Sequence, residues 1–115
     1  MREIKWSKRF DKGYSKCKKR GYKMQKLNDL VHIISTREFT DEERLKYKVH
    51  MLYNDKRYKN CMELHIGGKK SDWLLIYHIE GNTAYFDDTY VTLENTGTHA
   101  DCFESELLDN ELIWL

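Results

Sequence analysis

The chain has 115 residues, of which 34% are charged and 40% hydrophobic, and this length supports the core of one domain but not of two. No apolar run reaches the length of a membrane span, and the N-terminus lacks the basic-then-apolar pattern of a signal peptide. We therefore expect a cytoplasmic protein that begins at Met1. The three cysteines, Cys17, Cys61 and Cys102, are an odd and sparse set, which is typical of reduced thiols rather than of a disulfide framework.

The formal net charge of +1 conceals a separation of charge along the chain. All 20 Lys and Arg residues lie within residues 1–70, whereas residues 71–115 contain 10 of the 19 Asp and Glu residues and no Lys or Arg. A basic half of this kind can bind a polyanion such as RNA, and such binding weakens steeply with salt. It can equally be a solvated surface that attracts the acidic half of the same domain, so charge alone does not decide for a nucleic-acid partner.

The N-terminal half is predicted to contain a strand followed by helices. Residues 3–6 have the pattern of a short strand, and apolar residues spaced by three and four predict helices over residues 7–20 and 23–35. Gly21 ends the first helix. The T-D-E-E sequence at residues 40–43 has the form of a capping box, which predicts a third, short helix.

The second half is predicted to be an antiparallel meander. Its aromatic and β-branched segments are separated by Gly- or Asp-containing turns and cover residues 61–66, 72–79, 83–86 and 90–94. A strand, two to three helices and then a meander define an α+β fold. In the central strand we expect Leu74 and Ile76 to face the helices, Trp73 to pack in the sheet, and the remaining face to carry function. Asp72 then avoids the core only by lying at the very start of the strand.

Histidines near the predicted strand ends suggest acid–base chemistry. RNA is cleaved without a metal when a base takes the 2′-hydroxyl proton, an acid protonates the leaving 5′-oxygen, and donors stabilise the phosphate. Histidine suits both proton-transfer roles because its ordinary pKa is close to neutrality. The chain offers His50, His65 and His99, with Asp72 beside them. In a small domain a histidine is more often a surface or core residue than a catalyst, so the residues alone leave both interpretations open.

Two motifs in the last third of the chain are more specific. Asp72-Trp73 opens a D-W-L-L-I-Y strand, and residues 96–103 have the pattern T-G-T-H-x-x-x-F, ending at Phe103. Together with the basic first helix and the sequence Y-K-V-H ending at His50, they resemble the YafQ branch of the RelE superfamily, bacterial toxins that cut messenger RNA. The resemblance covers nearly the whole chain. It implies a RelE-like fold and the toxin of a type II toxin–antitoxin system, a ribosome-dependent mRNA endonuclease.

The resemblance also implies roles for individual residues. The family attributes acid–base work and RNA contacts to the residues matched here by His50, His65, Asp72, His99 and Phe103. We expect His99 to be the general acid and Asp72 or His50 the base. His65 is expected to bind phosphate or support its neighbours, and Phe103 to stack on an unpaired base. The implied reaction uses side chains only, with no metal and no other cofactor.

The implied partners are a cognate antitoxin, the ribosome and its mRNA, with no membrane. The expected ribosome contacts are the cations of the first helix: Lys8, Lys12, Lys16, Lys18, Lys19 and Arg20. Residues 1–115 are expected to be one domain, in which residues 104–115 form a C-terminal extension beyond the usual end of the family. This extension either caps the core or offers an apolar surface to a partner.

Other departures from the family pattern concern the site itself. Asn95 stands where the family has an Arg, immediately before T-G-T-H, so a neutral donor replaces a fixed charge beside the phosphate. The link between His65 and Asp72 is longer than usual, which brings Lys69 or Lys70 within reach of the phosphate. Both cations and Asn95 are therefore expected RNA contacts.

Two alternatives stay open at this level. Cys61-x-x-x-His65 and His99-x-x-Cys102 supply four potential zinc ligands, although neither pair has the tight C-x-x-C form. The Asn at position 95 also allows a catalytically weakened, non-enzymatic module that only binds its antitoxin or RNA. The joint presence of the five matched site residues favours the enzyme.

Overall fold

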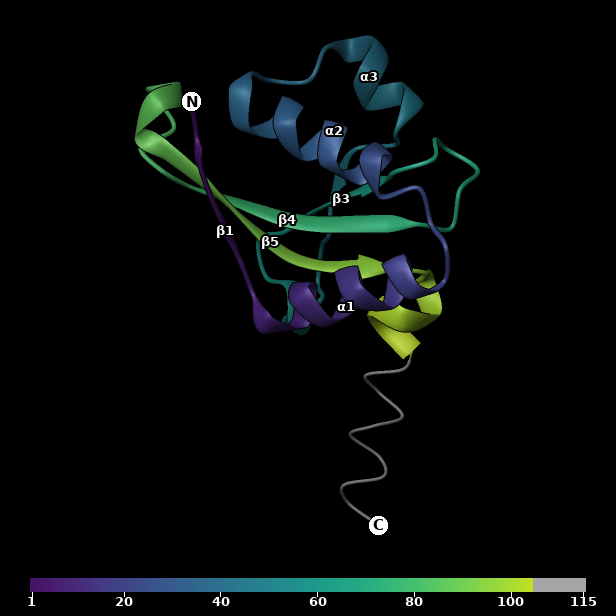
Figure 1. Cartoon of the computed structure of the whole chain (residues 1–115). Helices are drawn as coiled ribbons and strands as arrows, with labels where there is room; N and C mark the ends of the chain where they lie inside the picture. The colour runs from purple at the N-terminus through teal and green to yellow at the C-terminus, as the bar shows by residue number, and fades with distance from the viewer. Residues whose placement is uncertain (105–115) are drawn as a thin grey trace.

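Over residues 1–104, the chain forms a five-stranded sheet and three α-helices (Figure 1). The computed structural model describes residues 1–104, so the predicted C-terminal extension lies, apart from Glu104, outside the described residues. The elements in chain order are β1 (Glu3–Trp6), α1 (Lys8–Lys19), α2 (Met24–Thr36), α3 (Asp41–Lys46), β2 (His50–Met51), η1 (Lys56–Tyr58), β3 (Met62–His65), β4 (Leu74–Gly81), η2 (Phe86–Asp88), β5 (Thr89–Gly97) and η3 (Ala100–Glu104). The turns η1 and η2 are 3₁₀-helical, and η3 is a π-helical turn.

The strands are ordered β1-β5-β4-β3-β2 in the sheet. β2 to β5 form an antiparallel meander, and β1 pairs in parallel with β5 from Glu3–Tyr90 to Trp6–Leu93. A parallel pair requires a crossover connection, which here contains the helices and the rest of the meander. The predicted α+β fold is therefore confirmed. Within residues 1–104, no helix combines the length and the apolar character needed to cross a membrane.

Local hydrogen bonds explain where the helices begin and end. Ser7 caps α1 by accepting a hydrogen bond from a backbone N–H at 3.0 Å, and Gly21, with φ of 84°, follows its C-terminal end. Thr40 and Glu43 form both hydrogen bonds of the predicted capping box at the start of α3. The Arg37 guanidinium, helped by the Thr40 backbone N–H, lowers the pKa of Glu43 to about 2.

One predicted strand is wrong: in the described structure, residues 83–86 belong to the connection between β4 and β5. The Asn82 side chain accepts a hydrogen bond from the Ala84 N–H at 3.1 Å, which closes a turn instead of extending the strand. Phe86, which contributed to the strand prediction, lies under the Arg2 guanidinium at 4.3 Å. The meander therefore has one strand fewer over this stretch than its aromatic residues predict.

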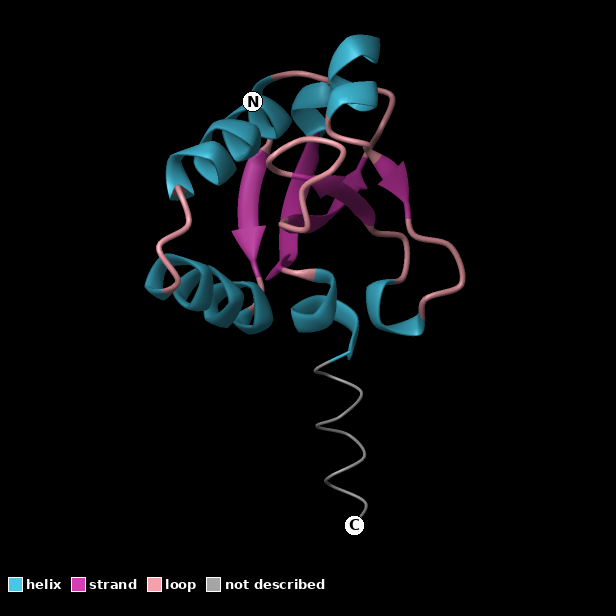
Figure 2. Cartoon of the chain, turned by 90° about the vertical axis from the view of Figure 1, so that its right-hand side faces the viewer, coloured by secondary structure: helices cyan, strands magenta, loops and turns pink. Residues whose placement is uncertain are grey.

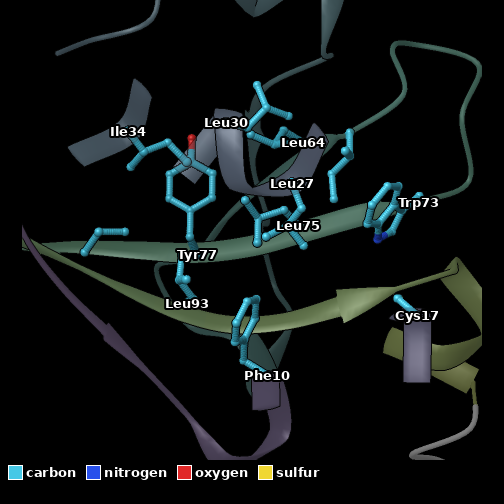
Figure 3. Close-up of a cluster of buried hydrophobic side chains, with 12 residues drawn as sticks. Phe10, Cys17, Leu27, Leu30, Ile34, Leu64, Trp73, Leu75, Tyr77 and Leu93 are labelled. Carbon is cyan, nitrogen blue, oxygen red and sulfur yellow. The ribbon is translucent and has the colours of Figure 1, made fainter. Parts of the chain in front are cut away.

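Apolar side chains are buried on both faces of the central strand. The larger cluster joins the sheet to α1 and α2, and Figure 3 labels ten of its members: Phe10, Cys17, Leu27, Leu30, Ile34, Leu64, Trp73, Leu75, Tyr77 and Leu93. Trp73 packs in this cluster, as predicted. Leu74 and Ile76 do not face α2, contrary to expectation; they belong to a second cluster with Tyr58, Cys61 and Cys102. Alternate residues of β4 do point to opposite faces of the sheet, as predicted. Because the residues on both faces are apolar, the pattern does not indicate which face the helices cover.

The second cluster lies where η1 and η3 pack against the sheet. Figure 2 shows both turns at the end of the sheet that also carries α1, opposite α2 and α3. The Tyr58 hydroxyl donates a hydrogen bond to the Cys102 carbonyl oxygen at 2.5 Å, which ties η1 directly to η3. This contact brings together two segments separated by more than forty residues.

Candidate active site

Strand pairing places three candidate residues on one face of the sheet. His50 of β2 stands opposite Glu63 of β3, and Glu63 and His65 are two residues apart on the same strand. Oε1 of Glu63 lies 3.5 Å from Nε2 of His50 and 3.5 Å from Nε2 of His65. Glu63 is only 4% exposed. The sequence reasoning missed this carboxylate, although its position two residues before His65 on a strand was an available signal.

Both of these histidines are oriented by backbone carbonyl groups. Nδ1 of His50 lies 2.7 Å from the Lys48 oxygen, and Nδ1 of His65 lies 2.6 Å from the Ser71 oxygen. A carbonyl oxygen can only accept a hydrogen bond, so Nδ1 carries the hydrogen in each ring. Each Nε2 is thereby directed toward Glu63. We call His50, Glu63 and His65 the strand-borne half of the site.

Asp72 and His99 meet outside the sheet. Oδ1 of Asp72 accepts hydrogen bonds from Nδ1 of His99 at 2.7 Å and from the His99 backbone N–H at 3.1 Å. Both side chains are more than half exposed. The contact with His99 lowers the pKa of Asp72. As predicted, Asp72 lies before the first residue of β4 and so avoids the core.

The T-G-T-H motif sets the position of His99. Thr96 donates to the Leu74 carbonyl oxygen at 2.7 Å and accepts from the indole N–H of Trp73 at 3.0 Å. Gly97 has φ of 149°, and a Cβ there would lie 2.8 Å from that of Asp101, so no larger residue fits without a shift. Asp101 accepts a hydrogen bond from the Thr98 N–H and donates its own N–H to the Thr98 hydroxyl, at 3.0 and 3.1 Å. The motif thus spans the end of β5 and leads into η3.

Aromatic rings continue from His99 to η1. The His65 and His99 ring centroids are 5.8 Å apart, those of His99 and Phe103 are 6.0 Å apart, and those of Phe103 and Tyr58 are 5.3 Å apart. Phe103 is partly buried. We call Asp72, His99 and Phe103 the loop-borne half of the site. The structure therefore gathers His65, Asp72, His99 and Phe103, and Glu63 links His50 to this group.

Arg57 is a second residue that the sequence reasoning did not place in the site. Its guanidinium carbon lies 5.4 Å from the Phe103 ring centroid, and Nη1 donates to the Phe103 carbonyl oxygen at 2.5 Å. Asp55 accepts from the same guanidinium, at 3.2 Å from Nη2, and this contact lowers the pKa of Asp55. The position of Arg57 depends on η1 packing against η3, which no local sequence pattern predicts.

Asn95 does not occupy the position expected for it. Its side chain is buried, and its Nδ2 donates to the Tyr58 hydroxyl at 3.0 Å while Oδ1 accepts from the Thr96 backbone N–H at 2.9 Å. A Cβ on Gly13 would lie 3.0 Å from Asn95 Oδ1 and 2.4 Å from the Thr96 carbonyl oxygen, so α1 closes over this residue. The expected contact between Asn95 and the phosphate does not fit this buried position. The side-chain amide of Asn95 instead connects β5 to η1 through Tyr58.

The predicted cations fall into two groups. Lys69 and Lys70 are exposed in the β3–β4 loop, which also contains Asp72. On α1, Lys16 and Arg20 are ion-paired with Asp101 at 3.2 and 2.5 Å, and the Arg20 guanidinium holds the pKa of Asp101 well below its usual range. The other predicted cations of α1 are exposed: Lys8, Lys12, Lys18 and Lys19.

The four-ligand zinc site is not assembled. Cys61 and Cys102 lie in the buried cluster beneath the sheet, where burial raises their thiol pKa values to about 11 and about 12. Across residues 1–104, no group of three or more His, Cys, Asp or Glu side chains is arranged to hold a metal ion. The two cysteines are core residues in this structure.

Comparison with known proteins gives the family. A family model described as a bacterial toxin of type II toxin–antitoxin systems, YafQ, matches residues 2–104. Among solved structures, YafQ from E. coli strain BL21(DE3) is 28% identical with a TM-score of 0.69, and the alignment covers 90% of this chain and 99% of that one. The toxin in an E. coli DinJ–YafQ complex is 30% identical with a TM-score of 0.67, over 90% and 99% of the two chains.

A metal-bound toxin from Helicobacter pylori is 29% identical with a TM-score of 0.68, over 90% of this chain and 100% of that one. No curated protein sequence matches the chain. The family match spans every described element from β1 to η3 and includes all the site residues placed above. The chain belongs to the YafQ family of bacterial type II toxin–antitoxin toxins.

Proposed function

We propose that this toxin is an endoribonuclease that cleaves mRNA on the ribosome by metal-independent acid–base catalysis. The observation that carries the proposal is the 2.7 Å contact between Nδ1 of His99 and Asp72. It fixes the ring and leaves Nε2 as the atom that meets the substrate. A protonated His99 then donates from Nε2 to the leaving 5′-oxygen, while the Asp72 carboxylate stabilises the imidazolium.

The base is assigned to His50 rather than to Asp72. Oδ1 of Asp72 is held by two N–H groups of His99, whereas the His50 ring is 41% exposed and has its Nδ1 anchored on a carbonyl. Nε2 of His50 accepts the 2′-hydroxyl proton as the 2′-oxygen attacks phosphorus. The phosphorus–5′-oxygen bond breaks, giving a 2′,3′-cyclic phosphate and a 5′-hydroxyl. His65, which is largely buried, supports its neighbours.

Substrate binding uses the residues around this pair. Phe103 stacks on an unpaired base, as exposed aromatic rings do with single-stranded RNA. The negative charge that builds on the phosphate needs donors, and the cations offered by the loop-borne half include Arg57 beside Phe103 and the exposed lysines of the β3–β4 loop. These cations take the role that Asn95, being buried, does not fill.

The proposed macromolecular partners are a cognate antitoxin and the ribosome. The E. coli relative has been solved in a DinJ–YafQ complex, which supports an antitoxin for this toxin as well. The exposed lysines of α1 are the proposed ribosome contacts, and Lys16 and Arg20 contribute less because Asp101 already pairs with them. Charge-reversing Lys18 and Lys19 is expected to weaken ribosome association and to flatten its salt dependence.

The test is single-turnover cleavage of ribosome-bound message by the parent, by His99→Ala and by the control His32→Ala, whose side chain is exposed on α2. We expect His99→Ala to lose about 10²–10⁴-fold in rate and the control to match the parent, with cleavage unaffected by a chelator selective for zinc over magnesium. Parental cleavage by His99→Ala would overturn the assignment. A parent that binds its antitoxin but cleaves nothing would instead be a non-enzymatic binding module.

A further inference from the structure

We propose that a groove at the α1–α2 junction is a nucleotide subsite, which binds the message strand on one side of the scissile bond through Lys23, Lys26 and Tyr22. This inference rests on the proposed function. The groove has a volume of 460 Å³, within the roughly 300–1,000 Å³ of typical ligand sites. Asp72 and Thr98 form part of its wall, so it is continuous with the Asp72–His99 pair.

The cations of this groove differ from those of the nearby end of α1. Lys23 and Lys26 are exposed, and among residues 1–104 neither ammonium group is ion-paired. Lys16 and Arg20, by contrast, are paired with Asp101. The first turn of α2 contains no acidic residue, so the positive end of its dipole adds to the charge of the two lysines. The groove therefore favours an anionic occupant.

Its aromatic wall favours a nucleotide over another anion. The Tyr22 and Trp73 rings lie 5.0 Å apart with an interplanar angle of 67°, and Trp73 is itself fixed by its hydrogen bond to Thr96. Tyr22 is partly exposed. A ring held in this way, next to two ammonium groups, presents a face for a base and donors for its phosphate.

The groove also has a place in the path of the strand. Phe103 lies on one side of His99, with ring centroids 6.0 Å apart, and Asp72, which contacts His99, lines the groove. An RNA strand that places its scissile phosphate at His99 then has one base at Phe103 and another at Tyr22. The subsite would thus fix the register of the strand at the cut.

The test measures binding, so that it does not depend on cleavage. The probe is a single-stranded RNA titrated by fluorescence anisotropy; it carries a 2′-deoxy residue at a mapped cleavage site, or at its centre when the parent cleaves no message. Binding by the parent is compared with Lys23→Gln/Lys26→Gln, with the conservative Lys23→Arg/Lys26→Arg, and with Lys5→Gln/Lys59→Gln, which changes the net charge equally at exposed positions outside the groove. We expect only Lys23→Gln/Lys26→Gln to reduce the steepness with which the logarithm of the binding constant falls with the logarithm of the salt concentration. The expected reduction is roughly 1.4 for two lost phosphate contacts.

A phosphate scan locates the contacts. Replacing one phosphate at a time with an uncharged methylphosphonate should weaken parental binding at one or two positions on one side of the cut. The groove double variant should bind equally well whether or not those phosphates are charged, and the Lys5→Gln/Lys59→Gln control should keep the parental pattern. Tyr22→Leu should weaken binding at least about fivefold, and Tyr22→Phe should not.

Three results would overturn the proposal. One is a groove double variant that retains the parental phosphate pattern, and another is a uniform loss of binding with no preferred position. The third is a groove double variant that binds polyglutamate more weakly than the parent does but binds RNA as the parent does. That result would assign the groove to an acidic protein segment. A parent that binds the probe as expected but cleaves no message would contradict the proposed function and leave the subsite supported.

Discussion

The two halves of the active site are built differently. The strand-borne half is fixed by sheet register: His50 stands opposite Glu63, and Glu63 and His65 share one face of β3. The loop-borne half is fixed by hydrogen bonds outside the sheet, chiefly that of Asp72 with His99. Glu63 is 4% exposed, whereas the Asp72 side chain is 63% exposed. On the proposed assignment, the half fixed by sheet register holds the base His50 in position, and the more solvated half carries the acid His99.

Asp72→Asn tests the loop-borne half most directly. Asparagine retains an oxygen for the His99 N–H groups but cannot stabilise an imidazolium. We therefore expect the maximal single-turnover rate to fall about 10²-fold, at the lower end of general-acid contributions, with RNA binding not weakened. The control is Asp41→Asn, which makes the same change at an exposed position in α3. A parental rate for Asp72→Asn would show that the carboxylate only shapes the loop.

Glu63→Gln tests whether the strand-borne half needs its buried charge. The amide keeps the shape of the side chain but no longer offers a carboxylate to the two histidine Nε2 atoms at 3.5 Å. We expect a loss of about tenfold in rate, smaller than that of a direct proton donor. The pH–rate profile separates the roles, because a merely structural residue leaves its shape unchanged. Glu42→Gln, exposed in α3, is the control.

Asp101→Asn weakens the attachment of η3 to α1. The Arg20 guanidinium holds the pKa of Asp101 below its usual value of about 3.8, so the ionised form is stabilised by folding. That stability is fully present above about pH 3.8 and is lost as the pH falls through the lower pKa of the folded state. Because Arg20 is partly exposed, we expect a loss of only about 1 kcal/mol at pH 7, vanishing in strong acid. Urea unfolding across pH measures it, and a loss that is independent of pH would contradict the ion-pair explanation.

Thiol labelling gives the finest comparison of the two halves. Cys61 immediately precedes β3 and Cys102 lies within η3, and both thiols are buried with raised pKa values. Labelling in the native state therefore requires local opening. We expect Cys102 to react a few-fold faster than Cys61, because η3 has no strand partner. Mass spectrometry of timed iodoacetamide reactions gives both rates, and equal rates would mean that the two halves open together.

What the sequence predicts well in this toxin is local. The capping box at residues 40–43 and the end of α1 at Gly21 depend on neighbours within one turn, and both are found. The contact between Asp72 and His99 agrees with the family motifs, which place both residues in the site. The strand predicted over residues 83–86 failed because Asn82 forms a turn with its own backbone neighbours, which aromatic content does not reveal.

The long-range features of the site could not be predicted in this way. Strand pairing places Glu63 opposite His50, and the packing of η1 on η3 places Arg57 beside Phe103. The sequence predicts Asn95 as a neutral donor to the phosphate, yet its side chain is buried and its amide donates to the Tyr58 hydroxyl. Each of these contacts joins segments whose spacing carries no periodic signal. The roles in catalysis and RNA binding therefore stay predictions for the experiments above.

The parallel pairing of β1 with β5 has a consequence for the synthesis of this toxin. Residues 3–6 find their strand partners only at residues 90–93, and the buried side chain of Arg2 donates to Thr89 at 2.8 Å. The first strand to leave the ribosome therefore has no partner until almost the whole described chain has been made. Completion of the sheet by the β1–β5 pair is thus a late event in folding. His99 follows β5 in the sequence. A nascent chain thus completes its sheet and gains His99, the proposed general acid, within a few residues of each other, so that incomplete translation products lack both.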